Sequence, residues 1–153
     1  MNKFKFILLI TFCATSLFSC KKGNETPSNS SDKNLKLTVT VSGFNKAEGD
    51  YISFVAVGSP VNSDNKTIWK INGVAQANEQ GIGLSGDDFS GSVKTYVLES
   101  NVPINIGSVS IQGINFGSEF KISYKAELNG KILNNDENIS VAVDKDYTHN
   151  YNY

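Results

Sequence analysis

Apolar and polar residues alternate along most of the chain after residue 34, and this period of two constrains the fold more than any other feature. Residues 35–41 read Leu-Lys-Leu-Thr-Val-Thr-Val. Four apolar side chains therefore point to one face of an extended strand and the polar ones to the other. The same alternation recurs in residues 93–98, 120–128 and 147–153. Because no window shows an apolar stripe at helical spacing, the pattern predicts an all-β domain.

Turn residues divide these strands. Asn72-Gly73 and Asn129-Gly130 are strong hairpin signals, because a type I′ turn needs positive φ at both central positions. The first predicts strands over 67–71 and 74–78, and the second joins 120–128 to 131–133. A separate strand is expected over 139–143, and we expect the tyrosine-rich end of the chain to pair back into a sheet.

Residues 51–57 (YISFVAV) are apolar on both faces, so we expect a central strand that is covered on both sides. In all, eight or nine short strands are expected, with turn residues every 8–12 positions. This spacing is typical of a two-sheet antiparallel sandwich, immunoglobulin-like or of a related Greek-key topology.

The start of the chain indicates export. Lys3 and Lys5 precede an apolar stretch over residues 6–18, which is too short to cross a bilayer but has the build of a secretory signal peptide. It ends in Leu17-Phe18-Ser19-Cys20, which resembles the lipobox of bacterial lipoproteins. The resemblance implies cleavage after residue 19 and a thioether-linked lipid on Cys20. It also implies a place in the bacterial cell envelope, for which we expect the outer membrane.

The expected organisation has three parts: a signal peptide over 1–19, a lipidated cysteine with a flexible tether over 20–33, and a β-sandwich domain over 34–153. The tether is rich in Ser, Asn and Lys and lacks apolar residues to bury, so it cannot offset its ordering entropy. The domain is similar to the small immunoglobulin-like sandwich domains of envelope lipoproteins.

Charge and cysteine content narrow the function. The 14 basic residues are all lysine and the formal net charge is −1, which argues against a nucleic-acid partner because that needs a clustered basic face. Cys13 lies in the predicted signal peptide, so Cys20 is the one cysteine of the mature chain and no internal disulfide is expected.

Two stretches, one rich in glycine and one in aspartate and asparagine, are candidate sites. GIGLSG over 81–86 matches G-x-G-x-x-G but lacks the flanking strand and helix of a dinucleotide site, so we expect a flexible loop and no cofactor. Asp87 and Asp88 are candidate Ca²⁺ ligands, and Asn62, Asp64 and Asn65 would join them if the loops gathered at one end of the sandwich. The alternative, which we prefer, is that these carboxylates are solvated turn residues.

His149 is the single histidine, and it lacks the partners of a zinc site or of a serine hydrolase. We expect it to be a polar residue on an edge strand among tyrosines. Trp69 and Tyr96 are the candidate ligand-binding aromatics, since such rings stack on sugars or anchor protein partners. The alternative for Trp69 is the core tryptophan of the sandwich.

The sequence therefore predicts a membrane-anchored envelope lipoprotein with a non-catalytic binding domain, attached to the membrane through Cys20 and taking a glycan or an envelope protein as its partner. Two alternatives stay open. One is a structural or assembly subunit that completes a neighbour's sheet through an edge strand, and the more remote one is a metal-dependent or hydrolytic protein.

Overall fold

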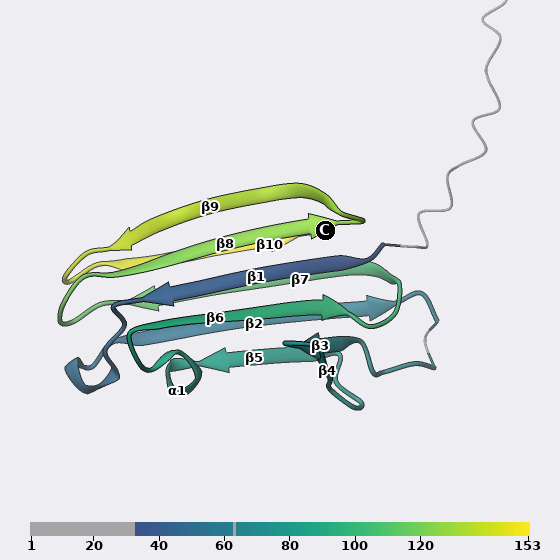
Figure 1. The fold of residues 1–153 in the computed structure, drawn as a ribbon, viewed down its shortest axis with the longest axis horizontal. Helices are drawn as coiled ribbons and strands as arrows, with labels where there is room; N and C mark the ends of the chain where they lie inside the picture. Colours follow the sequence, from purple (N-terminus) through teal and green to yellow (C-terminus); the bar gives the residue numbers. More distant parts are fainter. Residues whose placement is uncertain (1–32, 63) are drawn as a thin grey trace, which may run out of the picture.

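The computed structural model describes residues 33–62 and 64–153. These residues form ten strands, a one-turn α-helix and a short 3-10 helix in two antiparallel sheets (Figure 1). The six-stranded sheet has the order β4-β3-β6-β1-β8-β9, and the four-stranded sheet has the order β10-β7-β2-β5. The elements in chain order are β1 (Leu35–Ser42), η1 (Lys46–Glu48), β2 (Tyr51–Pro60), β3 (Trp69–Ile71), β4 (Val74–Ala75), β5 (Gly81–Ser85), α1 (Gly86–Phe89), β6 (Val93–Ser100), β7 (Ile104–Ile114), β8 (Phe120–Leu128), β9 (Lys131–Val141) and β10 (Asp146–Asn152).

The predicted all-β, two-sheet sandwich is confirmed, with ten strands in the described residues where eight or nine were expected. β1 shows why the alternation works. Its apolar positions, from Leu35 to Val41, are at most 1% exposed. Its neighbours β6 and β8 pair with it along both edges, and its apolar face belongs to the core between the two sheets, so the period-2 strand buries one complete face.

Both predicted hairpins are confirmed. Asn72 and Gly73 have φ of 48° and 82°, and Asn129 and Gly130 have φ of 51° and 78°, which are the signs a type I′ turn requires. The first hairpin is shorter than predicted, because β3 and β4 span only residues 69–71 and 74–75. The expected strands over 131–133 and 139–143 are one continuous strand, β9, which ends at Val141.

The prediction for residues 51–57 is only half correct. β2 is central in its sheet, between β7 and β5. It is covered on one face alone, because Tyr51 is 46% and Val57 is 48% exposed while Ile52 and Phe54 are buried. The run of apolar residues hid this difference, since hydrophobicity alone does not distinguish a covered face from an open one.

The expected loop over 81–86 is wrong: residues 81–85 form β5 and α1 follows at once. Ile82 and Leu84 are buried and alternate with exposed Gly81 and Gly83. The strand pairs antiparallel with β2. Because glycine occupies the exposed positions, the sequence does not show the alternation of polar and apolar side chains that would mark Ile82 and Leu84 as the buried face of a strand. All strand pairs in the described residues are antiparallel, so they contain no βαβ unit of a dinucleotide fold.

The core lies between the two sheets and is filled by large side chains, the most voluminous of which are Trp69, Tyr124, Phe54, Phe89 and Phe120. The C-terminal strand β10 pairs with β7, as predicted. β1 begins, and β10 finishes, at the same end of the sandwich (Figure 1). Both ends of the described chain therefore lie away from α1.

Candidate functional site

Four connections meet at the end of the sandwich that carries α1, and we call this surface the loop end. They are residues 43–50 between β1 and β2, residues 86–92 between β5 and β6, residues 115–119 between β7 and β8, and residues 142–145 between β9 and β10. In antiparallel sheets, alternate connections fall at the same end, so the strand order itself brings these four segments together. Polar side chains then join one segment to the next.

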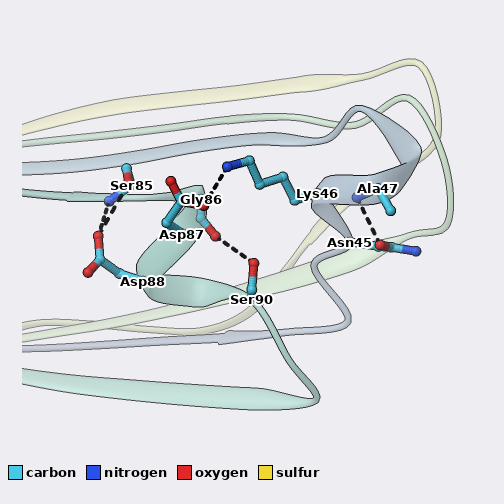
Figure 2. Close-up of polar contacts among 8 residues, drawn as sticks. All are labelled: Asn45, Lys46, Ala47, Ser85, Gly86, Asp87, Asp88 and Ser90. Atoms are coloured by element: carbon cyan, nitrogen blue, oxygen red, sulfur yellow. Dashed lines mark hydrogen bonds and ion pairs between the residues drawn. The ribbon is translucent and has the colours of Figure 1, made fainter.

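Lys46 and Asp87 link the first two segments. Their Nζ and Oδ1 atoms form an ion pair between η1 and α1 (Figure 2). The two side chains are 56% and 79% exposed, so water screens the pair and its contribution to stability is small, about 0–1 kcal/mol. Lys46 lines two shallow hollows of about 420 Å³ and 240 Å³, and Asp87 lines the smaller one with it.

Asp88 holds the start of α1. Its Oδ2 atom accepts hydrogen bonds from the Ser85 backbone N–H at 2.7 Å and from the Ser85 hydroxyl at 3.3 Å. The Ser90 hydroxyl donates to the Gly86 carbonyl at 3.0 Å (Figure 2). A carboxylate at the third position of a helix that reaches back to the N-cap is the standard way to satisfy the free N–H groups of the first turn. Asp88 is thus committed to local structure.

Asn45 and Glu48 organise the 43–50 segment. The Ala47 N–H donates to Asn45 Oδ1 at 3.1 Å (Figure 2), and Asn45 Nδ2 donates to Glu48 Oε1 at 2.7 Å. A backbone hydrogen bond from Ser118, with a second from the Asn45 side chain, lowers the pKa of Glu48. Both bonds favour the ionised carboxylate, so Glu48 serves as an acceptor that connects two loops.

Asp50 is buried at the loop end, at 5% exposure. It accepts three backbone hydrogen bonds, from Asn45 N at 3.2 Å, Phe116 N at 2.9 Å and Gly117 N at 3.2 Å. A buried charge is costly unless such donors surround it. Asp50 therefore fastens the 43–50 segment to the 115–119 segment, and sequence reasoning did not single it out. The signal available in the sequence was the position of Asp50 directly after Gly49 and just before the strand β2.

The candidate calcium ligands do not assemble as the sequence allowed. The first set, Asn62, Asp64 and Asn65, comes just after β2 ends. The second set, Asp87 and Asp88, lies in α1 beside the start of β2, because β5 runs antiparallel to β2. The two sets are at opposite ends of the sandwich, so the condition for a shared site is not met. Within residues 33–62 and 64–153, no group of three or more His, Cys, Asp or Glu side chains is placed to hold a metal ion.

Trp69 is a core residue. Its side chain is fully buried and its Nε1–H donates to the Gln80 carbonyl at 3.0 Å, so it presents no ring face to a ligand. Tyr96 is half-buried, packs edge-on against Phe89 with ring centroids 5.4 Å apart, and donates its hydroxyl to the Asp88 carbonyl at 3.0 Å. A ligand-binding role for Tyr96 stays a prediction. In the structure the Tyr96 side chain stabilises α1 through these two contacts.

His149 lies on the edge strand β10 among tyrosines, as expected. Its ring centroid is 6.3 Å from that of Tyr147 and 4.3 Å from that of Tyr151.

Tyr151 donates its hydroxyl to Asp136 Oδ2 at 2.8 Å. The Tyr153 hydroxyl bonds that of Tyr124 at 2.9 Å and donates to Asn134 at 3.0 Å. Burial, with the neighbouring hydrogen bonds, raises the pKa of Tyr124 and Tyr151, so both phenols stay protonated and close the side of the sandwich.

The predicted lipidation residue Cys20 lies outside the described residues. Among those the structure does describe, no helix has the length and apolar character needed to cross a membrane.

Comparison with known proteins shows likeness at the level of fold. No protein-family model matches the chain, and no curated protein matches it. A crystal structure of a DUF4425 family protein from Bacteroides ovatus superposes with a TM-score of 0.56 at 12% identity, covering 80% of this chain and 94% of that one. The NMR structure of the calcium-bound form of a protein from Parabacteroides distasonis gives 0.54 at 15% identity, covering 78% and 92%. At this identity the likeness establishes the sandwich alone.

Proposed function

We propose that this chain is a lipid-anchored protein of the bacterial cell envelope whose sandwich domain binds a partner without catalysing a reaction. The lipobox-like sequence ending in Cys20 supports the anchor. One structural observation carries the binding role: the described chain enters the sandwich at the end opposite to the loop end (Figure 1). A domain tethered through residues 20–33 would then hold the loop end away from the membrane.

The polar network of the loop end supports a binding role over a catalytic one. Asp88, Glu48 and Asp50 are each held by hydrogen bonds from backbone N–H groups of their own or neighbouring loops. These bonds commit the carboxylates to shaping a surface, and at Glu48 they lower the pKa, whereas a general acid needs its pKa raised toward neutrality. The shallow hollows beside Lys46 suit the contact of a broad partner, such as an envelope protein or a glycan.

The anchor is tested by labelling cells with an alkyne-tagged fatty acid and by separating membrane from soluble fractions. We expect the Cys20→Ala chain to lose the label and to leave the membrane fraction, because one residue carries the lipid. Cys13→Ala is the matched control and should keep both properties. Membrane association and labelling that survive in Cys20→Ala would refute the anchor.

The orientation is tested by protease treatment of intact cells, followed by detection of the C-terminal strand. Cleavage in intact cells would place the domain outside the cell and direct the search toward surface partners. Protection until the outer membrane is opened would place it in the periplasm and direct the search toward envelope proteins by crosslinking. A loop-end variant, Lys46→Glu, should then weaken the crosslinks. Crosslinks that are unchanged in that variant would remove the loop end from the proposed contact.

A further inference from the structure

The strand β5 is an edge of the four-stranded sheet. Within the described residues it pairs with β2 and with no other strand. An edge strand presents main-chain donors and acceptors that another strand can use.

The register determines which groups are free. The Gly58 N–H donates to the Gln80 carbonyl at 2.9 Å, in line with the pairing of Ala56 with Ile82. Hydrogen-bonded pairs alternate along an antiparallel ladder. Ile82 and Leu84 therefore exchange hydrogen bonds with β2, and the N–H and C=O groups of Gly81 and Gly83 point away from the sheet. The third outward N–H, that of Ser85, is taken by Asp88.

The outer face of the sheet is open at Gly83, because a Cβ atom added there would meet nothing within 4 Å. The edge itself is unprotected. β5 carries no charged residue, proline or bulge, which are the usual protections of an edge. The edge strand β9 differs, since it has two register shifts against β8 and an inward-facing Asp136. β4, at the other edge of that sheet, has only two residues.

The facing sheet extends past this edge. The Trp69 indole reaches the Gln80 carbonyl, which places β3 beside the start of β5 and β4 farther out in the same sheet. Ile71 pairs with buried Leu98, and Val74 pairs with Ile71. Cross-strand partners share a face, so Val74 lies on the core-facing side of its sheet, yet it is 64% exposed. The position that a further strand beside β5 would occupy therefore adjoins an uncovered apolar side chain.

Charge identifies the kind of occupant. Exposed Glu79 precedes β5, and at the other end of the strand the Asp88 carboxylate accepts the outward-pointing Ser85 N–H, whereas Asp87 is already paired with Lys46. If two copies paired through β5 around Gly83, Glu79 of one copy would lie near the Asp88 carboxylate of the other, and like charges brought together in this way are destabilising. The carboxylates at both ends instead complement an extended segment that carries basic residues.

We propose that β5 receives an extended segment of another protein as an added strand, with an apolar side chain over Val74 and Lys or Arg near Glu79 and Asp88. The main-chain groups of Gly81 and Gly83 would form its hydrogen bonds, in the manner of β-strand addition. The inference goes beyond the function proposed above, because it assigns a contact surface separate from the loop end. It depends neither on the lipid anchor nor on the loop end, so failure of the Cys20 or Lys46 experiment leaves it intact.

The test uses the ¹⁵N-labelled full chain in detergent micelles and the capped peptide Lys-Thr-Val-Thr-Val-Thr-Lys. We expect the peptide to shift the amide signals of Gly81 and Gly83 and to slow their hydrogen exchange. Gly83→Pro removes an N–H that the fold does not use, and proline is tolerated at such an edge position. It should weaken peptide binding by about tenfold, because a peptide carbonyl loses its donor. Gly83→Ala, the matched control, keeps the N–H and should bind like the unmodified chain.

Thermal unfolding of both variants verifies that they are folded, and a peptide with Glu in place of both Lys residues should bind more weakly. Equal binding by Gly83→Pro, or shifts confined to other residues, would overturn the proposal. Slow exchange of Gly81 and Gly83 before peptide is added would show that the edge is already covered and would also overturn it. So would a concentration-dependent dimer that Gly83→Pro dissociates, since that would assign the edge to a second copy.

Discussion

Asp50 should be the most sensitive polar residue of the loop end, and its replacement tests how that surface is held together. The Asp50→Ala change removes the acceptor for three backbone N–H groups, those of Asn45, Phe116 and Gly117. Each buried donor left without a partner costs about 1–3 kcal/mol. Phe116 is 60% exposed, so water can reach part of the site, and we take the lower bound for each group.

The expected loss is then about 3 kcal/mol in the free energy of unfolding. For a domain of about 120 residues, the unfolding entropy is about 0.25 kcal/mol/K, and the loss corresponds to a decrease of about 12 °C in Tm. Asp50→Asn keeps the shape and one acceptor oxygen but turns an NH₂ group toward a donor, so it should lose roughly half as much.

The assay is thermal unfolding followed by circular dichroism, with urea unfolding as an independent measure of the free energy. Asp87→Ala is the matched control, because it removes an exposed ion pair at the same end of the sandwich and should shift Tm by less than about 4 °C. A shift in Asp50→Ala as small as that of the control would show that the 43–50 and 115–119 segments do not depend on Asp50.

Three further outcomes are expected. The fluorescence of Trp69 should resist quenching by acrylamide, and Trp69→Phe should cost about 2 kcal/mol by urea unfolding; ready quenching would contradict its place in the core. Tyr124 and Tyr151 have pKa values raised by burial, so the folded state retains protons that the unfolded state releases above about pH 10. Stability should therefore be constant below that pH and fall as the pH rises above it. Tyr151→Phe should lose less stability at high pH than the unmodified chain, and an equal loss in both would contradict this account. Finally, Asp88 is already bonded to Ser85, so millimolar CaCl₂ should leave Tm within about 1 °C of its value in MgCl₂; a larger, saturable rise would reveal a calcium site.

Local chemistry accounts for the parts of the fold that were predicted correctly. The alternation from Leu35 to Val41 and the Asn-Gly pairs at Asn72 and Asn129 depend only on side-chain direction and on the left-handed conformation that these residues tolerate. Both are properties of neighbouring residues, so they can be read without knowledge of the rest of the chain.

The errors occurred where burial depends on a distant segment. Tyr51 and Val57 are as apolar as covered residues, but within residues 33–62 and 64–153 no layer lies over their side of the four-stranded sheet. Gly81 and Gly83 belong to a strand because β2 pairs with it, and glycine gives little local preference for that state. The loop end was missed for the same reason, since two of the hydrogen-bond donors to Asp50 are Phe116 and Gly117, which lie 66 and 67 positions farther along the chain.

The sequence by itself determined the β class, the two tight hairpins and the expectation of a lipidated N-terminus, because periodicity, turn chemistry and a contiguous motif are all local. Only the tertiary structure decided the strand order, the burial of Trp69 and the assembly of four connections into one loop end. It also decided that the outward groups of Gly81 and Gly83 lie at an edge beside Val74. Pairing between strands far apart in the chain sets these features, and alternation shows which face of a strand is buried without showing which strand lies beside it.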